Sequence, residues 1–177
     1  MENILSSFDS CGYCPYKQQR HLTDEQKTNR LEPPIGLESN NSKTLLVFQS
    51  PGVEEWECGK AIQNITKPGG TAGARIYQSW ERTGFVRNDF DIVNLIRCFS
   101  GSTSSRDNKP DLLAICSCVD KLIADLNTHQ YERVISFGDE ANQIISALKK
   151  SGRFKFIVRN SKHPNGGASQ DSLDALW

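Results

Sequence analysis

The sequence predicts an α/β fold, a single domain of three layers in which helices cover both faces of a central, mostly parallel sheet of four strands. Two patterns lead to this prediction. Four short apolar runs rich in Val, Ile and Phe are bounded by Gly, Asp, Asn or Ser, as buried strands are. Segments with helical periodicity lie between these runs. The 177 residues are enough for one domain with its own core and too few for two comfortable ones.

The expected elements follow a polar, Pro-containing connector at residues 30–43. The strands are 44–48, 90–96, 133–137 and 154–158, and the helices are 72–85, 111–126 and 139–152. Each helix has an apolar face. These faces consist of Ile76, Tyr77 and Trp80 in the first helix, Leu112, Cys116, Val119, Leu122, Ile123 and Leu126 in the second, and Ala141, Ile144, Ile145 and Leu148 in the third.

The segments that follow the strands are the candidate site, because ligands of parallel sheets bind beyond the carboxyl ends of the strands. The first strand runs into "QSPGVEEWECG", and the second carries Asn94 and runs into Cys98. The third ends in "FGDEA" and the fourth in "RNSKHPNGG". We expect a Pro-Gly turn with backbone amides, an amide side chain, a cysteine and a histidine to converge on one pocket.

The charges are balanced overall but unevenly placed. With 21 basic and 21 acidic residues, the whole-molecule field does not favour nucleic acid. Residues 141–170 nevertheless contain no carboxylate. They hold six basic residues, which are Lys149, Lys150, Arg153, Lys155, Arg159 and Lys162. A solvated face explains such a run as well as nucleic-acid contact does, and the adjoining "KHPNGG" favours the second interpretation.

The N-terminus lacks a basic segment followed by an apolar run, and no stretch approaches membrane-spanning length. We therefore expect a cytoplasmic protein that does not contact a membrane. In a reducing compartment, the six cysteines are better explained as metal ligands, catalytic groups or buried apolar residues than as disulfides. "CGYC", with Cys11 and Cys14, is the closest pair.

Six pieces of the chain, in order, are similar to the motifs of one family. They are "CGYC", "LLVFQSPGVEEWECG", "DIVNLIRC", the 111–126 helix, "VISFGDEA" and "KHPN". Their order over nearly the whole chain resembles the iron-sulfur uracil-DNA glycosylases of the uracil-DNA glycosylase superfamily. The resemblance implies a single uracil-DNA glycosylase-like domain over residues 1–177. It also implies that residues 1–43 form a cysteine-containing N-terminal segment tied down by a metal cluster.

The resemblance further implies that Cys11, Cys14, Cys98 and one cysteine of "ICSC" hold a 4Fe-4S cluster. Cys118 is the favoured fourth ligand, because Cys116 lies in the apolar stripe of its helix as a small core residue while Cys118 projects from the flank. Cys58 and Cys116 are then interpreted as buried or unreactive thiols. A structural zinc site and a redox-active "CGYC" pair remain alternatives.

The chemistry implied is hydrolysis of an N-glycosidic bond after the base is flipped out of DNA. We interpret His163 as the donor that stabilises negative charge on the departing base. Asn94 is expected to present its amide to the flipped base. The backbone amides that follow Pro51 and Gly52 are expected to face the base or a phosphate.

The remaining candidates for contact with DNA are Asn165, Lys162 and Arg159, which flank the histidine. We expect the partner to be single- or double-stranded DNA, with or without a modified base, and the protein to be a monomer.

Several positions depart from the family pattern. Gln49 and Ser50 stand where a glutamate would order the attacking water, and Glu55 either matches an acidic family position or caps the following turn. Ile62 replaces the aromatic that stacks on the base, and "NGGAS" replaces an apolar wedge. Three hypotheses therefore stay open: a glycosylase for uracil or a related base in DNA repair, a DNA-binding or base-sensing module without turnover, and a metal protein whose basic run binds a protein.

Overall fold

The four expected strands form one sheet in which every pairing is parallel. In the computed structural model, which describes residues 10–16, 22–24, 34–67, 70–103 and 107–177, the strand order is β2-β1-β3-β4. The strands are β1 (Thr44–Phe48), β2 (Asp91–Asn94), β3 (Arg133–Phe137) and β4 (Ile157–Ser161). The predicted α/β fold class is confirmed.

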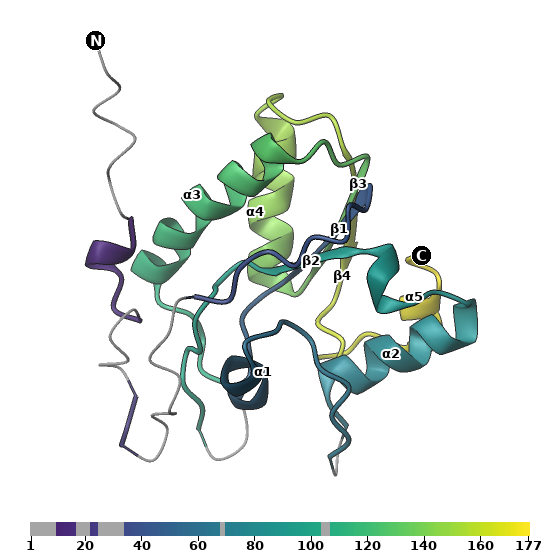
Figure 1. Ribbon diagram of the computed structural model, residues 1–177, viewed down its shortest axis with the longest axis horizontal. Coiled ribbons are helices and arrows are strands. Elements are labelled where there is room, and N and C mark those ends of the chain that lie inside the picture. Colours follow the sequence, from purple (N-terminus) through teal and green to yellow (C-terminus); the bar gives the residue numbers. More distant parts are fainter. Residues whose placement is uncertain (1–9, 17–21, 25–33, 68–69, 104–106) are drawn as a thin grey trace.

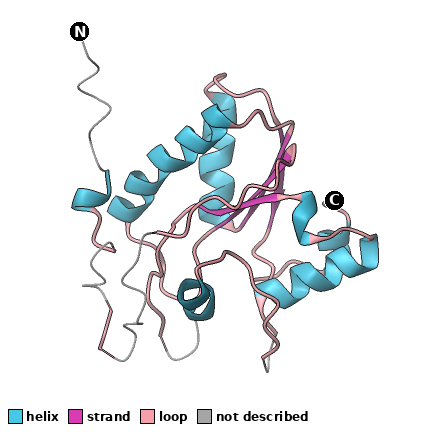
Figure 2. Cartoon of the chain, in the orientation of Figure 1, coloured by secondary structure: helices cyan, strands magenta, loops and turns pink. Residues whose placement is uncertain are grey.

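Helices cover both faces of this sheet (Figure 1). The α-helices in the described residues are α1 (Val53–Cys58), α2 (Ala72–Thr83), α3 (Leu112–Thr128), α4 (Asp139–Lys150) and α5 (Gln170–Asp174). Two short 3-10 turns, η2 (Ser10–Tyr13) and η3 (Arg87–Asp89), accompany them. α3 and α4 lie on one side of the sheet and α2 and α5 on the other (Figure 1), and Figure 2 sets the helices apart from the strands by colour. None of the described helices is long and apolar enough to cross a membrane.

The central strand β1 shows why the chain adopts this arrangement. Its five residues are all buried, and successive side chains point to opposite faces. Leu45 and Val47 belong to the core under α3 and α4, whereas Leu46 and Phe48 belong to the core under α2 and α5. A strand that is apolar on both faces is stable only between two helical layers.

The strand bounds differ from the prediction at β2 and β4, and the helices differ by one or two residues at their ends. β2 covers only part of the 90–96 run, and β4 begins three residues later than expected, at Ile157. Phe154 and Phe156 are buried, but they belong to the segment that enters this edge strand. The short helices α1 and α5 were not predicted, because five or six residues are too few to show a helical period.

The expected apolar stripe of α3 is wrong in its first half. Leu112 is 72% exposed and Cys116 is exposed, whereas Ala114 and Cys118 are buried in line with Leu122 and Leu126. The buried row follows i, i+4 spacing, and its first half consists of small residues that a hydropathy pattern weights weakly.

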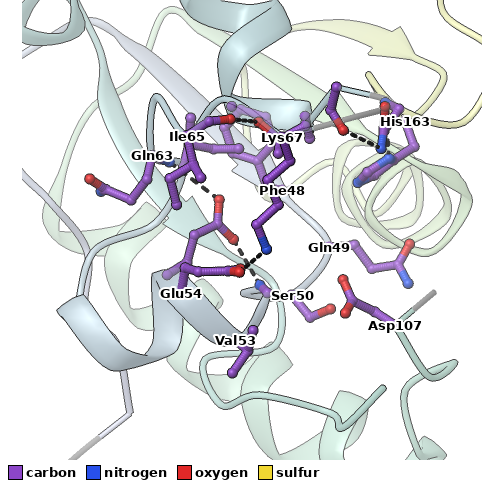
Figure 3. Close-up of a pocket in the computed structure, with 18 of the residues that line it drawn as sticks. Phe48, Gln49, Ser50, Val53, Glu54, Gln63, Ile65, Lys67, Asp107 and His163 are labelled. Atoms are coloured by element: carbon purple, nitrogen blue, oxygen red, sulfur yellow. Dashed lines mark hydrogen bonds and ion pairs between the residues drawn. The ribbon is translucent and has the colours of Figure 1, made fainter. Parts of the chain in front are cut away.

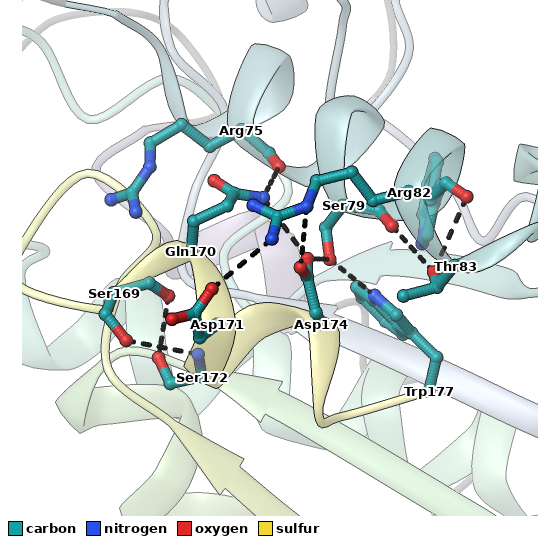
Figure 4. A network of polar contacts seen from close by, with 11 residues as sticks. Arg75, Ser79, Arg82, Thr83, Ser169, Gln170, Asp171, Ser172, Asp174 and Trp177 are labelled. Carbon is teal, nitrogen blue, oxygen red and sulfur yellow. Dashed lines mark hydrogen bonds and ion pairs between the residues drawn. The ribbon is translucent and has the colours of Figure 1, made fainter.

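A polar network fixes the chain after β4 onto α2 (Figure 4). The Oγ of Ser79 donates to Asp174, and the indole N–H of Trp177 donates to the same Oγ at 2.8 Å. Arg82 pairs with Asp174 at 3.0 Å. The Trp177 ring also packs against Trp80, with centroids 5.9 Å apart. These contacts therefore anchor α5 and the residues after it on α2.

Candidate active site

A cavity of about 600 Å³ opens at the carboxyl edge of the sheet (Figure 3). This volume lies in the range of small-molecule sites. Its walls come from the ends of β1 and β4, from α1, from the start of α2 and from the loop after β2. The lining residues are Phe48, Gln49, Ser50, Gly52, Val53, Glu54, Glu55, Ile62, Gln63, Ile65, Lys67, Gly70, Thr71, Ala72, Gly73, Ser102, Asp107, His163 and Asn165.

The wall contains many of the residues predicted from the strand ends. Those inside it are His163, Gln49, Glu55, Ser50, Gly52, Ile62 and Asn165. The predicted residues outside it are Asn94, Pro51, Lys162 and Arg159.

His163 follows β4, where its surroundings disfavour the charged form of its ring. Burial lowers the pKa of its ring, while nearby Glu140 raises it. The backbone N–H of Asn165 donates to its Nδ1 at 3.3 Å. Since Nδ1 accepts this hydrogen bond, the hydrogen of the neutral ring sits on Nε2. His163 therefore offers the cavity an uncharged N–H donor.

Gly138, at the end of β3, lets Gln49 and His163 approach one another. A Cβ at this position would lie 3.2 Å from Gln49 Oε1 and 3.8 Å from Cδ2 of His163. The φ of Gly138 is +93°, a conformation that favours glycine. Arg75 of α2 steadies the histidine loop from the other side, because its guanidinium donates to the carbonyls of Pro164 and Ala168.

The end of β1 contributes an aromatic side chain to the cavity wall. Phe48, the last residue of β1, lines the cavity, and its ring stacks on Phe137 with centroids 4.4 Å apart and planes within 5°. Ile62 is where the prediction put it, buried in the wall, with a φ of +49° that is rare for a β-branched residue. Arg87 holds this strained turn by donating to the carbonyls of Ala61 at 2.6 Å and Ile62 at 2.5 Å.

Glu55 serves the backbone rather than a ligand. One of its carboxylate oxygens accepts the N–H of Gly52 at 2.8 Å, and the other accepts the N–H of Gln63 at 3.3 Å. Burial raises the pKa of Glu55, and these two hydrogen bonds lower it. The expectation that the Gly52 amide faces the base is therefore wrong, and the capping alternative for Glu55 describes its contacts.

Two further charged groups of the wall pair with each other. Lys67 forms an ion pair with Glu54. Asp107, from the loop after β2, is a third carboxylate in the wall, besides Glu54 and Glu55. Partial removal of its carboxyl group from water raises its pKa, and the charge of Lys67 lowers it.

Asn94 lies beneath the wall rather than in it. It pairs in register with Phe48 on the neighbouring strand and is 1% exposed. Among the described residues no hydrogen-bond partner contacts its Nδ2. Asn94 is not among the residues that line the cavity, so its contact with the base edge stays a prediction.

The basic run does not surround the cavity. Lys149 and Lys150 end α4, at the edge of the sheet opposite to the cavity, because α4 starts at the carboxyl end of β3. Arg159, expected to touch DNA, donates instead to the carbonyls of Ala175 and Leu176. Lys162 is exposed beside the histidine loop, and thus remains a candidate for DNA contact.

The predicted metal ligands gather at a second place, where η2 packs on the start of α3. Cys11, Cys98 and Cys118 are buried and Cys14 is partly buried. Burial raises the pKa of the Cys118 thiol, a hydrogen bond from the Arg97 backbone lowers it, and neighbouring Cys14 and Cys11 raise it further. The four cysteines thus share one corner of the molecule.

The four cysteine side chains do not form a metal-binding geometry in the described residues. Among the described residues, no group of three or more His, Cys, Asp or Glu side chains has the spacing that would hold a metal ion. Cys58 and Cys116 are both exposed. The expectation that Cys116 is a core residue is therefore wrong. Cys118, which was expected to project from the flank of the helix, is the buried one of the two.

Sequence reasoning missed Phe48, Gln63, Lys67 and Asp107 as parts of the wall. Phe48 had a signal, since it is the last residue of an expected strand. Asp107 had no such signal in the sequence. It lies in a polar loop and is positioned by an isolated bridge to Ser102.

Two comparisons of the sequence with known proteins bear on the family of this chain. No protein-family model matches it, and no curated protein is significantly similar to it in sequence. The resemblance to iron-sulfur uracil-DNA glycosylases therefore stays a hypothesis.

Proposed function

We propose that this protein is a DNA glycosylase that hydrolyses the N-glycosidic bond of uracil or a related modified base after flipping it out of DNA. The observation that carries the proposal is one cavity at the carboxyl edge of the sheet in which His163, Gln49 and Phe48 meet. Phe48 and Gln49 come from the end of β1 and His163 from the segment after β4, so all three lie at the carboxyl edge of the parallel sheet, where ligands of such folds bind.

The cavity suits an extruded base. The ring of Phe48 offers an apolar face, and the amides of Gln49 and Gln63 can hydrogen-bond the base edge. As the glycosidic bond breaks, negative charge develops on the base and positive charge on the sugar. The neutral Nε2–H of His163 would stabilise the anionic base more than the intact nucleotide, which is what a catalytic donor must do.

The cysteine corner is proposed to hold a 4Fe-4S cluster, with structural zinc as the alternative. The donors would be the thiolates of Cys11, Cys14, Cys98 and Cys118, which join η2, the loop after β2 and α3. Such a centre would brace the N-terminal segment and the loop that leads to Asp107. Soft thiolate donors suit iron-sulfur clusters and zinc alike, so iron, sulfide and zinc analysis of anaerobically purified protein would decide between them.

The test is a screen for base release. Single- and double-stranded oligonucleotides that contain uracil or other modified bases are incubated with the protein, and abasic sites are revealed by alkali. We expect release of at least one base, and a loss of about 10²–10³-fold in His163→Ala. His129→Ala is the matched control, because His129 follows α3, far from the cavity wall. Equal release by wild type and His163→Ala would contradict the proposal, as would no release at all.

A second candidate is a base-sensing or DNA-binding module without turnover. It is favoured by the use of Glu55 to hold two backbone amides and by the small residues "NGGAS" after the histidine. It requires salt-dependent affinity for DNA without release of any base. Fluorescence anisotropy at two salt concentrations, run beside the release assay, separates the two functions.

A further inference from the structure

We propose that Asp107 holds and activates the water that attacks the sugar in the hydrolysis proposed above. The assignment rests on the proposed glycosylase function and deepens it. Gln49, the first residue after β1, brings an amide to the cavity wall, and an amide is not a proton acceptor for a bound water. The structure supplies a carboxylate to the same cavity from a different part of the chain.

Asp107 lies against the turn that leads out of β1. Its Oδ2 is 3.9 Å from the position that a Cβ on Gly52 would occupy. Figure 3 shows its carboxylate directed toward Gln49 and Ser50, in the same wall as His163. A water bound by Asp107 would thus sit in the cavity that also contains the proposed donor to the base.

The loop that carries Asp107 is folded back on itself. Ser102 and Asp107 form an antiparallel bridge. The N–H of Asn108 donates to the carbonyl of Gly101 at 2.8 Å, and the Oγ of Ser100 donates to the carbonyl of Asn108 at 3.0 Å. These bonds fix the backbone on which the carboxylate is mounted, and a fixed position is what a proton acceptor for a bound water needs.

The other carboxylates of the wall are committed to other contacts. Glu55 accepts two backbone N–H groups, and Glu54 is paired with Lys67. The oxygens of Glu55 and Glu54 are occupied by these partners, which leaves the two carboxylates less free to hold a water. Of the carboxylates that line the cavity, Asp107 is therefore the one suited to take a proton.

The step balances with these groups alone. The water oxygen bonds to the anomeric carbon as the carbon–nitrogen bond to the base breaks, and Asp107 accepts the proton of the water. The bond electrons leave on the base, whose charge is stabilised by the Nε2–H of His163. The proton then passes from Asp107 to the base or to solvent, which restores the enzyme and leaves an abasic sugar.

The pH dependence has a definite sign. Asp107 is exposed as a residue, but partial removal of its carboxyl group from water in the cavity wall raises its pKa above the ordinary value of 3.8, and the charge of Lys67 opposes this shift. The charged and titratable groups that face it are Glu54 and Glu55 from α1, Lys67 from the loop before α2, and His163 from the loop after β4. Since the ionised form is the proton acceptor, the rate of base release should rise as the pH rises through this pKa.

The experiment compares wild type with Asp107→Asn in single-turnover release of the best base from the screen. Glu57→Gln is the matched control, since Glu57 is an exposed carboxylate of α1 outside the wall. We expect Asp107→Asn to lower the rate about 10²–10⁴-fold. Its affinity for the same oligonucleotide should stay within a factor of about three, and the acid limb of the pH profile should disappear. Glu57→Gln should behave as wild type.

Each other result overturns the assignment in a recognisable way. An active wild type with an equally active Asp107→Asn would refute the role of Asp107 and leave the glycosylase function standing. A loss of DNA affinity as large as the loss of rate would make Asp107 a binding residue. A wild type that releases no base would refute the proposed function and the assignment together.

Discussion

Replacing Gly138 by alanine is expected to destabilise the fold and disturb the cavity. The residue has φ +93° and ψ 163°, a region open essentially only to glycine, so the backbone strain alone should cost about 1–3 kcal/mol. The new Cβ would also lie 3.2 Å from Gln49 Oε1, closer than ordinary contact allows. In a domain of this size, about 2–4 °C of melting temperature is lost per kcal/mol, which predicts a fall of about 2–12 °C.

The assay is thermal denaturation combined with NMR of the His163 ring. Gly84→Ala is the control: its φ is +80° and nothing lies within 4 Å of the new Cβ, so it carries backbone strain without crowding a side chain. Both variants should melt earlier, but only Gly138→Ala should shift the His163 ring signals and reduce base release. Unchanged melting and unchanged ring signals in Gly138→Ala would refute the reasoning.

Three further predictions concern packing, pH and the cysteine corner. A Cβ on Gly73 would lie 2.7 Å from the carbonyl carbon of Gln63, whereas Gly36 faces open space; urea denaturation should show a loss of about 1–3 kcal/mol for Gly73→Ala and almost none for Gly36→Ala. The hydrogen bond from Arg87 is the main cause that lowers the pKa of Glu38. The stability that this interaction contributes is fully present above pH 4.5, the ordinary pKa of a glutamate, and is lost as the pH falls through the lower pKa of Glu38 in the folded protein. Glu38→Gln should therefore reduce the loss of folding stability on acidification, measured between about pH 3 and pH 7. Cys118→Ser should abolish bound iron and visible absorption, whereas the exposed Cys116→Ser should retain both, and equal retention would contradict the proposed ligand set.

The fold was predictable because its apolar runs are buried on both faces and bounded by polar or glycine residues. β1 and β3 have the bounds that the sequence indicates. β4 was misplaced because Phe154 and Phe156 look like strand residues, although they fill the core ahead of an edge strand with a largely exposed surface. Apolar character alone cannot distinguish a strand residue from a buried loop residue.

The site was partly predictable for a related reason. Gln49 and His163 follow strands directly, so the carboxyl-edge rule places them correctly. Asn94 lies outside the cavity wall, because a place at a strand end does not reveal that the register buries the residue beside Phe48. Asp107 could not be found at all, since a loop bridge formed by two polar residues leaves no periodic pattern in the sequence.

The position of β1 at the centre of the sheet also bears on how quickly the chain folds. Leu46 pairs with Ile92 on one side and with Ile135 on the other, so both neighbours of this strand lie far along the chain. Pairings this distant require closure of long loops before they yield any stabilisation, which slows folding. Until then a fully apolar strand stays accessible to other chains, and production at low temperature or with added chaperones should raise the yield of native protein.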